Sequence, residues 1–501
     1  MAKNKKKKPA APTLHNSPEV KLGVVGVSRD CFPIELTRKR LKKQGVNAEA
    51  CSVVIENEGD MLEAEAEMAI KEVNAIVMFL GNFGPEGPTT RFAERFEGPV
   101  MFCAAAEETK ATLKKDRGDA YCGMLNASYN LRLRDLPAYI PQMPVGQVDE
   151  LAEKIAEFVP IARILLGLSS LRVFAFGPRP QDFFACNAPI QPFYDLGIEV
   201  MENSELDLLE LYKAAGARKK EIAAVAKDME KELGKGATYP DLLPKLAQFE
   251  VALLDFMEQN LGASEYAVFA DKCWPAFEAA FGFVPCYINS RLASRGIPVA
   301  CEVDMYGAVS EYMCQLATGL PATLLDINNT VPPDMIKKGD NLKGATAEDL
   351  FMGFHCGNTP SCCMKNCSMK FQLIMNRLME DGKDPDITRG TLEGQIRPGP
   401  VTLFRLQSTS DGELRSYVAE GNVLDKNPSS FGAIGIFAIP GMARFYRHVL
   451  IAGGFPHHSA IAFEHAGKAL FEAVKYLGIE EIGAPLPASL PYPGENPFEL
   501  F

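Results

Sequence analysis

Several features that would place this chain in a common class are scarce or missing. It has one tryptophan and six histidines in 501 residues, and acidic residues outnumber basic ones by 64 to 52. The net charge of −12 argues against a general nucleic-acid-binding protein. We find no apolar run long enough to span a bilayer and no signal-peptide core, so we expect no membrane association.

Nucleotide-binding motifs and a disulfide framework are missing too. The glycines of LGVVGVSRD do not form the G-x-G-x-x-G fingerprint, and no G-x-x-x-x-G-K segment followed by Ser or Thr occurs. These motifs therefore give no support to a nucleotide cofactor. The thirteen cysteines are odd in number and widely scattered, unlike those of a disulfide scaffold. We expect reduced thiols and a cytoplasmic location.

Strands and helices alternate over most of the chain, which predicts parallel sheets covered by helices. One such series runs to about residue 170, and a second begins at Leu171–Gly177. After about residue 345, short strands punctuated by Gly and Pro predict an antiparallel, barrel-like domain. The expected fold class is α/β, with two Rossmann-like parallel-sheet domains followed by a β-rich C-terminal domain.

These changes of pattern define four expected segments. Residues 1–18 form a disordered basic tail, because the lysine-rich block Lys3–Lys8 has no apolar run beside it. Residues 19–170 form the N-terminal α/β domain, and residues 171–345 form the second. Residues 346–501 form the β-rich domain.

Two short apolar runs that end on an acid carry the chemistry of the chain. Ile297–Glu302 (IPVACE) and Pro321–Asp326 (PATLLD) flank Met305–Gly319, which has the pattern of a helix closed by glycine. Strand, helix and strand in this order predict a βαβ unit with parallel strands. Glu302 and Asp326 would then lie at one sheet edge and repel each other unless a cation lay between them. Either acid alone is better explained as a helix cap or a lysine partner, and the argument for a site depends on both acids together.

Histidines that can complete a metal site lie in two glycine-containing segments. His457 and His458 fall in GGFPHHS, and His355 lies in FHCGNTP. Carboxylate oxygens, one imidazole and open positions suit Mn²⁺ or Mg²⁺, whereas a soft metal would require thiolates. A single histidine of this kind is more often an ordinary core or surface residue, so the argument depends on the combination.

Thiolates are available in the same region of the sequence. Cys356, Cys362, Cys363 and Cys367 lie in HCGNTPSCCMKNC, but their spacing matches no standard zinc or iron–sulfur motif. A thiol-based metalloprotein or redox sensor that uses the Cys356–Cys367 cluster is one alternative function. The default interpretation is that these cysteines are buried or redox-idle thiols near the site.

Several motifs together resemble the L-fucose isomerase/L-arabinose isomerase superfamily, in particular its fucose-isomerase-like branch. They are CWPAF at Cys273–Phe277, NSRLASRGIPVACEVD at Asn289–Asp304, LLDINN at Leu324–Asn329, FHCGN at Phe354–Asn358 and GGFPHHSA at Gly453–Ala460. The resemblance implies two α/β domains before a β-rich domain. It also implies a metal that is typically Mn²⁺, with Mg²⁺ or Co²⁺ as alternatives.

The resemblance assigns roles to particular residues. The metal-binding glutamate, aspartate and histidine of the family fall on Glu302, Asp326 and His458, with His457 as the fallback for the histidine. The arabinose isomerases add another histidine ligand, which would be His355 here. Whether His355 binds metal or substrate stays open.

Sugar contacts are expected from Lys272, Trp274, His355 and Asn358. In the family that the chain resembles, the N-terminal domain of a neighbouring subunit completes the site. Arg29 and the loop Gly81–Thr90 are candidates for that part. The resemblance therefore implies a homo-trimer or homo-hexamer that binds a small sugar.

The predicted function is a metal-dependent aldose–ketose isomerase of class EC 5.3.1, acting on a free sugar through a cis-enediol. Glu302 and Asp326 are the expected catalytic acids, and which of them is the base stays open. The expected substrate is L-fucose, D-arabinose or a 6-substituted hexose, whose acidic group would pair with Arg29 and Lys272. A non-catalytic sugar-binding homologue is the other alternative.

Overall fold

The described part of this computed structural model comprises residues 15–42, 45, 47–187, 189–496 and 498. Lys3–Lys8 of the expected basic tail lies outside the described residues. By contacts, the chain forms two compact units. The N-terminal unit contains residues 18–167 and 471–479, and the main unit contains the described residues up to 17, residues 168–470 and those from 480 onward.

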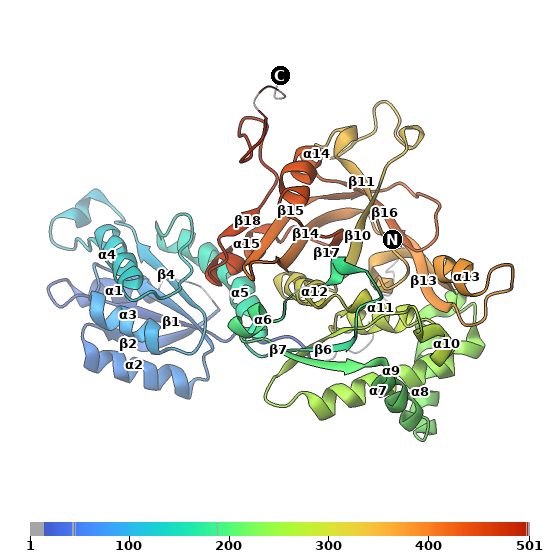
Figure 1. The fold of residues 1–501 in the computed structure, drawn as a ribbon. Helices are drawn as coiled ribbons and strands as arrows, with labels where there is room; N and C mark the ends of the chain where they lie inside the picture. Colours follow the sequence, from blue (N-terminus) through green and yellow to red (C-terminus); the bar gives the residue numbers. More distant parts are fainter. Residues whose placement is uncertain (1–14, 43–44, 46, 188, 497, 499–501) are drawn as a thin grey trace, which may run out of the picture. The chain divides into compact units, whose positions relative to one another are not determined.

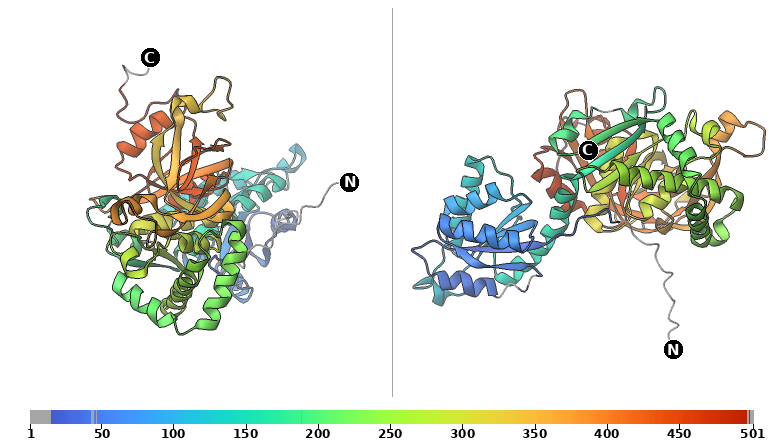
Figure 2. Two further views of the ribbon diagram at one scale, coloured as in Figure 1. Left: turned by 90° about the vertical axis from the view of Figure 1, so that its right-hand side faces the viewer. Right: turned by 90° about the horizontal axis from the view of Figure 1, so that it is seen from below.

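The N-terminal unit is built on a parallel sheet with the strand order β2-β1-β3-β4-β5. Its strands are β1 (Leu22–Val27), β2 (Glu49–Ile55), β3 (Ala75–Leu80), β4 (Val100–Ala105) and β5 (Val145–Gly146). Its helices include α1 (Ile34–Lys42), α2 (Glu58–Ile70), α3 (Glu86–Arg95), α4 (Ala120–Leu133) and α5 (Val148–Leu168). The strands run between the helices (Figures 1 and 2). Every residue of β1, β3 and β4 is buried, as expected for parallel strands covered on both faces.

The main unit contains a second parallel sheet with the order β7-β6-β8-β9. Its strands are β6 (Leu171–Gly177), β7 (Glu199–Ser204), β8 (Tyr266–Ala270) and β9 (Val299–Ala300). The helices beside it are α6 (Gln191–Asp195), α7 (Glu205–Ala215), α8 (Lys219–Leu233), α9 (Leu243–Asn260), α10 (Phe277–Phe281) and α11 (Cys286–Ser294). Phe174 of β6, Phe249 of α9 and Phe283 belong to the apolar core of this layer.

A larger, mixed sheet forms the rest of the main unit, with the order β12-β13-β16-β11-β10-β17-β14-β15-β18. Its strands are β10 (Thr323–Thr330), β11 (Leu350–His355), β12 (Met364–Phe371), β13 (Arg389–Ile396), β14 (Gly399–Ser408), β15 (Leu414–Leu424), β16 (Ala433–Ala438), β17 (His458–Ala462) and β18 (Glu481–Gly483). The helices that accompany it are α13 (Leu373–Met379), α14 (Met442–Phe445) and the start of α15 (Gly467–Tyr476), whose residues from 471 onward belong to the N-terminal unit. Because β15 also pairs with β16, the strands from β16 through β10 to β15 close into a ring. The predicted fold class is confirmed, whereas the domain boundary near residue 345 stays a prediction.

Helix α12 (Met305–Thr318) lies between the two sheets of the main unit and overturns the predicted βαβ unit (Figure 1). It contacts β6 and β8 on one side and β14 and β17 on the other. All residues from Tyr306 to Leu316 are buried, so the helix has no solvent-facing side. It therefore connects two sheets instead of crossing over one. Glu302 follows β9 and Asp326 lies in β10, which belong to different sheets, so the prediction of adjacent parallel strands was wrong.

Asn16, which the sequence analysis placed in the basic tail, is buried in the main unit. Its side-chain amide donates to the carbonyl oxygens of Ala267 and Gly296 at 2.8 Å each. Its side-chain oxygen accepts a hydrogen bond from the Ala267 N–H at 2.9 Å. These bonds anchor the segment before β1 to strand β8.

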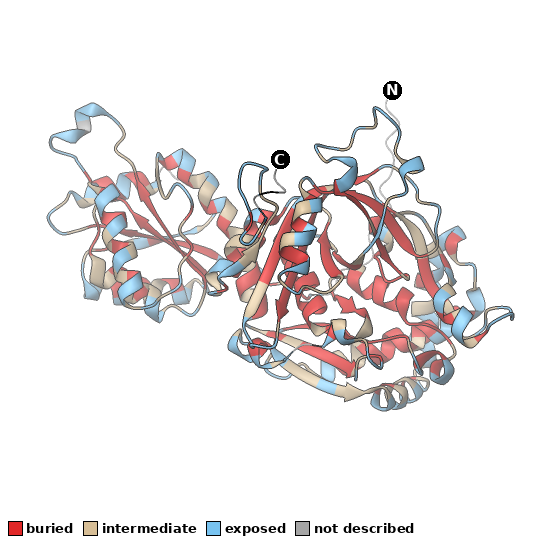
Figure 3. Cartoon of the chain, turned by 45° about the horizontal axis from the view of Figure 1, so that its top comes forward, coloured by how far each residue is buried: buried red, intermediate tan, exposed pale blue. Residues whose placement is uncertain are grey.

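Burial follows the sheets of both units. In Figure 3 the strands are mainly buried, and exposed residues gather on loops and outer helix faces. Among the described residues, every helix is too short or too polar to cross a membrane.

Candidate metal and active site

His458 is the centre of the candidate site. It is the first residue of β17 and is completely buried. The strand register places Asp326 of β10 directly opposite it. Nε2 of His458 lies 3.3 Å from Glu302 Oε2 and 3.5 Å from Asp326 Oδ1. The two acids thus meet at one imidazole, although they come from different sheets.

Glu302 reaches this position through a strained turn. It lies in the short 3₁₀ helix Cys301–Val303 between β9 and α12, with φ at 62° for Glu302 and 58° for Val303. A non-glycine residue in this left-handed region costs on the order of 1–3 kcal/mol, and a β-branched one is a clear outlier. The Val303 N–H donates to the Asp271 carbonyl oxygen at 2.8 Å, which helps to hold the turn. Strain of this kind gathers at functional sites, which supports a functional role for Glu302.

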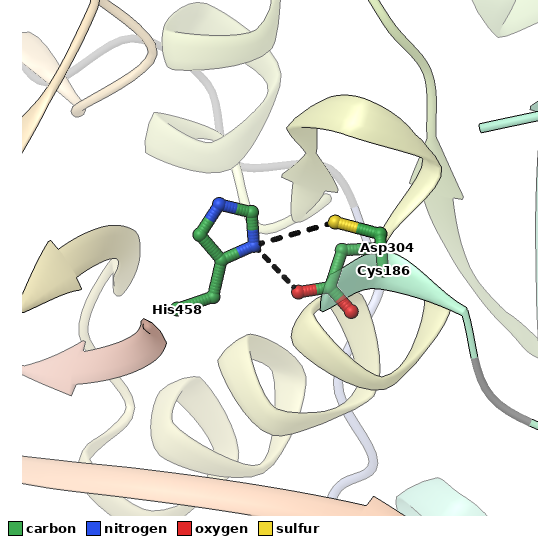
Figure 4. A group of neighbouring side chains, drawn as sticks. All are labelled: Cys186, Asp304 and His458. Atoms are coloured by element: carbon green, nitrogen blue, oxygen red, sulfur yellow. Dashed lines mark hydrogen bonds and ion pairs between the residues drawn. The ribbon is translucent and has the colours of Figure 1, made fainter. Parts of the chain in front are cut away.

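Asp304 orients the His458 ring, and the sequence analysis missed it. Its Oδ2 lies 2.8 Å from His458 Nδ1, and Cys186 Sγ lies 3.8 Å from the same nitrogen (Figure 4). An ionised carboxylate only accepts hydrogen bonds, so Nδ1 of His458 carries a proton. His458 Nε2 has no hydrogen-bond partner among the described residues and faces the two acids. Metal-binding histidines commonly donate their other ring N–H to a carboxylate in this way.

Arg405 balances the charge of Asp304. Its two terminal nitrogens donate to the two carboxylate oxygens at 2.5 and 2.9 Å, and both side chains are buried. Burial alone would raise the pKa of Asp304, but Arg405 and His458 outweigh it and hold that pKa well below its usual range. Asp304 therefore stays ionised and keeps accepting the His458 N–H.

Glu302 and Asp326 have pKa values shifted in opposite directions. Burial works to raise the pKa of Glu302, but the neighbouring His458 ring, 3.3 Å away, outweighs burial and lowers the pKa. Burial raises the pKa of Asp326 to about 6. The charge of His458 opposes this increase, and the charge of Glu302 adds to it. Environments that drive two carboxyl pKa values apart are typical of acid–base sites.

The donor atoms around His458 fit a divalent cation. Among the described residues, its ring joins three groups whose ligand atoms lie within 4.8 Å of one another. Their other members are Cys186 with Asp304, Glu302 with His457, and Asp326 with His355. The last two pairs add carboxylate and imidazole donors, which suit Mn²⁺ or Mg²⁺. In the described parts of the chain, these groups include no cysteine of the Cys356–Cys367 cluster, so the thiol-based alternative gains no support.

His355 and His457 flank the centre. The rings of His355 and His458 lie 5.9 Å apart, and His355 Nδ1 accepts the Cys356 N–H at 2.9 Å. His457 has a side chain 36% exposed, with Nε2 3.7 Å from Asp326 Oδ1. Burial, reinforced by the charge of His458, lowers the pKa values of both His355 and His457 to about 4. His458 is therefore the central histidine of the doublet, and His457 lies at the rim.

Lys272 follows β8, and its charge is already paired with an acid. Its Nζ donates to the Pro178 carbonyl oxygen at 2.7 Å and lies 3.0 Å from a Glu205 carboxylate oxygen. The side chain is only 5% exposed, so these contacts hold it in place. Lys272 is thus poorly suited to pair with an anionic substrate.

Phe183 is an aromatic wall residue that the sequence analysis also missed. Its ring centroid lies 6.3 Å from Trp274, 5.5 Å from His457 and 6.4 Å from His458. Trp274 is half-buried and packs on the apolar cluster that contains Cys273. A loop phenylalanine carries no local signal that separates a site wall from an ordinary core residue.

Asn358 and Arg29 belong to different units. Asn358 is buried in the main unit, and its side-chain oxygen finds no hydrogen-bond partner within the described chain. Arg29, in the N-terminal unit, donates to the Gly84 carbonyl oxygen at 3.1 Å and lies 3.4 Å from Glu86. Sugar contacts by either residue stay a prediction.

Two families match large parts of the chain. Residues 23–169 match the family described as fucose/sulfoquinovose isomerase, N-terminal domain, and residues 353–483 match L-fucose isomerase, C-terminal domain. The chain belongs to the L-fucose isomerase-like superfamily. The predicted resemblance is confirmed, and with it the enzyme class, an aldose–ketose isomerase.

Curated members of this superfamily include several relatives named sulfoquinovose isomerase. That of Clostridium sp. (strain MSTE9) is 27% identical over 331 residues, which is 65% of this chain and 67% of the relative. That of Priestia aryabhattai is 24% identical over 340 residues, 67% of this chain and 70% of the relative. That of Alkalicoccus urumqiensis is 23% identical over 336 residues, 65% and 68% of the two chains.

The Asp304–Arg405 pair generates a test. Asp304→Asn should destabilise the main unit by about 3–5 kcal/mol, because it leaves a buried guanidinium without its counter-charge. The double variant Asp304→Asn/Arg405→Gln removes both charges and should regain part of that loss. Urea unfolding followed by the fluorescence of Trp274, the only tryptophan, reports on this unit. A double variant no more stable than Asp304→Asn would contradict the pairing argument.

Proposed function

We propose that this protein converts sulfoquinovose, an aldohexose with a sulfonate on C6, into the corresponding ketose. The observation that carries the proposal is the convergence of Glu302 and Asp326 on the free nitrogen of buried His458. The curated relatives named sulfoquinovose isomerase support the choice of sugar. This sugar is a 6-substituted hexose with an acidic group, one of the predicted substrate classes. L-Fucose and D-arabinose are the alternatives.

Glu302, Asp326 and His458 would hold the divalent cation, with Mn²⁺ as the first choice and Mg²⁺ or Co²⁺ as alternatives. When bound, such a cation supplies positive charge to the carbonyl and hydroxyl oxygens of the sugar. His458 is favoured over His457 because Asp304 occupies its Nδ1 and leaves Nε2 for a ligand. His355 lies close enough to add a donor to the cation or to the sugar.

Glu302 and Asp326 would carry the protons. One carboxylate takes the proton from C2 of the open-chain sugar and returns a proton to C1, with a cis-enediol between the two steps. The second carboxylate serves the proton exchange between the two oxygens. Phe183 lies beside His457 and His458, and Trp274 packs against Phe183, so these rings would exclude water from the reacting carbons.

The assembly would be a homo-trimer or homo-hexamer in the cytoplasm. An apolar stripe on α4 supports an interface, since Tyr121, Leu125, Tyr129 and Leu133 recur every four residues and are each more than 60% exposed. In such an assembly, Arg29 of a neighbouring subunit would supply the cation for the sulfonate. None of the thirteen cysteines, all within the described residues, forms a disulfide, which supports a reducing compartment.

The choice of substrate is tested by ketose formation from a panel of aldoses with Mn²⁺ present. Sulfoquinovose should have the highest kcat/KM, at least about tenfold above D-glucose, which lacks the sulfonate; tenfold corresponds to about 1.4 kcal/mol of binding. A higher kcat/KM with L-fucose or D-arabinose would replace the proposed sugar. No conversion of any aldose would overturn the proposed function.

Glu302→Gln and Asp326→Asn should each lower kcat by about 10²–10⁴-fold or more, because each removes a proton-transfer group with little change of volume. Asp334→Asn, in the exposed turn after β10, is the matched control and should keep full activity. Circular dichroism should show the same fold in all three. Near-normal kcat in either site variant would remove that acid from the mechanism.

Chelation should abolish activity, and Mn²⁺ should restore it. His458→Ala should raise the Mn²⁺ concentration needed for half-maximal activity by about 10–100-fold or more. Mutation of residues that only support a metal ligand already lowers metal affinity by about this factor. His457→Ala should change this concentration far less, because His457 lies at the rim. The reverse order would make His457 the ligand. Full activity after exhaustive chelation would contradict the metal proposal.

A further inference from the structure

Cys362 and Cys363 form a thiol pair that belongs to none of the candidate metal-ligand groups found among the described residues. They end the 3₁₀ helix Ser361–Cys363, which lies between β11 and β12. Their Sγ atoms are 3.8 Å apart. The Cys362 side chain is exposed and the Cys363 side chain is buried. A dissolved reagent can therefore reach the Cys362 sulfur, whereas the Cys363 sulfur is shielded from solvent beside it.

The thiol pair lines a cavity of about 340 Å³. Leu320, Pro321 and Phe463 supply apolar walls, and Arg397 supplies a positive charge. The Arg397 N–H donates to the Cys363 carbonyl oxygen at 2.9 Å, and its side chain donates to the Met364 carbonyl oxygen at 3.0 Å. These bonds fix the cation beside the pair. The volume is at the lower end of the range for small-molecule pockets.

The two sulfurs differ in acidity. The hydrogen bond from Cys363, assisted by Ser294 and the charge of Arg397, lowers the pKa of Cys362 to about 7; the side chains that surround the sulfur below its exposed face only partly oppose this shift. The pKa of Cys363 is raised well above its usual value. A thiolate beside a neutral thiol is the usual arrangement of an attacking cysteine and its resolving partner.

We propose that Cys362 and Cys363 are a reversible oxidation site that reacts with hydrogen peroxide. The Cys362 thiolate attacks one peroxide oxygen, so that an S–O bond forms, the O–O bond breaks, and hydroxide leaves and is protonated to water. The Cys363 thiol then attacks the sulfur of this sulfenic acid, forming the S–S bond as the S–O bond breaks. The thiol proton leaves with the hydroxyl group as a second water. Two thiols are oxidised, and one peroxide is reduced to two waters.

The resulting disulfide should be easy to reduce. Neighbouring Cα atoms are only about 3.8 Å apart across a trans peptide. Most disulfides join Cα atoms that are about 4.4–6.8 Å apart, and bonds outside this range are strained and more reducible. Oxidation of the thiol pair is therefore expected to be reversed by an ordinary dithiol.

The thiol pair is connected to two segments that carry candidate ligands. Cys363 Sγ lies 3.9 Å from the carbonyl oxygen of Pro321, in the segment that leads into β10 and Asp326. The 3₁₀ helix of the pair follows the loop that begins after His355. Closing the S–S bond must turn the backbone of this helix, so oxidation should displace both segments and lower turnover.

Mass analysis of the full chain tests the modification itself, independently of the proposed function. Hydrogen peroxide should remove two hydrogens from the peptide that contains the thiol pair, and phenylarsine oxide, which bridges two thiols, should bind once per chain. Cys362→Ser and Cys363→Ser should each abolish both results. Cys356→Ser, in the same peptide, and Cys31→Ser and Cys122→Ser, at exposed single thiols, should leave both unchanged. Loss of two hydrogens in Cys362→Ser, or arsenical binding unchanged in both pair variants, would overturn the proposal.

A kinetic experiment tests the coupling, and this step alone depends on the proposed function. Peroxide should lower kcat/KM several-fold in the metal-loaded enzyme, and dithiothreitol should restore it. The untreated Cys362→Ser and Cys363→Ser variants should have normal kcat/KM, and neither should show the reversible loss. Complete disulfide formation without a change in kcat/KM would contradict the coupling. An enzyme inactive before oxidation would count against the proposed sugar chemistry, and the mass results would still decide the oxidation site.

Discussion

The hydrogen bond between His458 and Asp304 is the interaction on which the candidate site depends. Arg405 keeps Asp304 ionised, Asp304 takes the proton-bearing nitrogen of His458, and the other nitrogen faces Glu302 and Asp326. Without this chain of buried charges, the imidazole would have no fixed tautomer or orientation. The nitrogen that faces the two acids could then be either protonated or free, and a cation would lose a buried imidazole ligand of defined direction.

The same Asp304 also connects the site to the packing of the main unit. Its Oδ1 accepts the Gly307 N–H at 2.8 Å and so starts α12, the helix buried between the two sheets. The approach is close, since a Cβ on Gly307 would lie only 2.5 Å from Asp304 Oδ2. The position of the carboxylate is therefore set by the helix, and the position of the helix is set by both sheets. This explains how a strained turn at Glu302 can persist.

The cysteines show how the surroundings of a residue type determine its chemistry. Cys186 touches His458, yet burial raises its pKa to about 11 and keeps it a neutral thiol beside the candidate metal site. Cys362 lies on the surface beside a hydrogen-bond donor and a guanidinium, which favour the thiolate. The proposed hard-metal centre and the proposed thiol pair would thus use cysteines of opposite character within one unit.

The sequence by itself determined the fold class and the family, and it selected Glu302, Asp326 and the histidines as candidates, because these inferences depend on patterns visible along the chain. Apolar runs that end on Glu302 and Asp326, a glycine that closes α12 and a His-His loop are all visible along the chain. Tertiary structure alone decided the rest. Asp304 looks like an ordinary helix cap until Arg405, a hundred residues away in sequence, and His458 are seen to bind it. A strand–helix–strand pattern looks the same in the sequence whether its two strands belong to one sheet or to two different sheets. The burial of α12 between both sheets shows that the second case applies here. Lys272 likewise looked available for an anion until its pairing with Glu205 was known, since long-range charge pairing leaves no local pattern in the sequence.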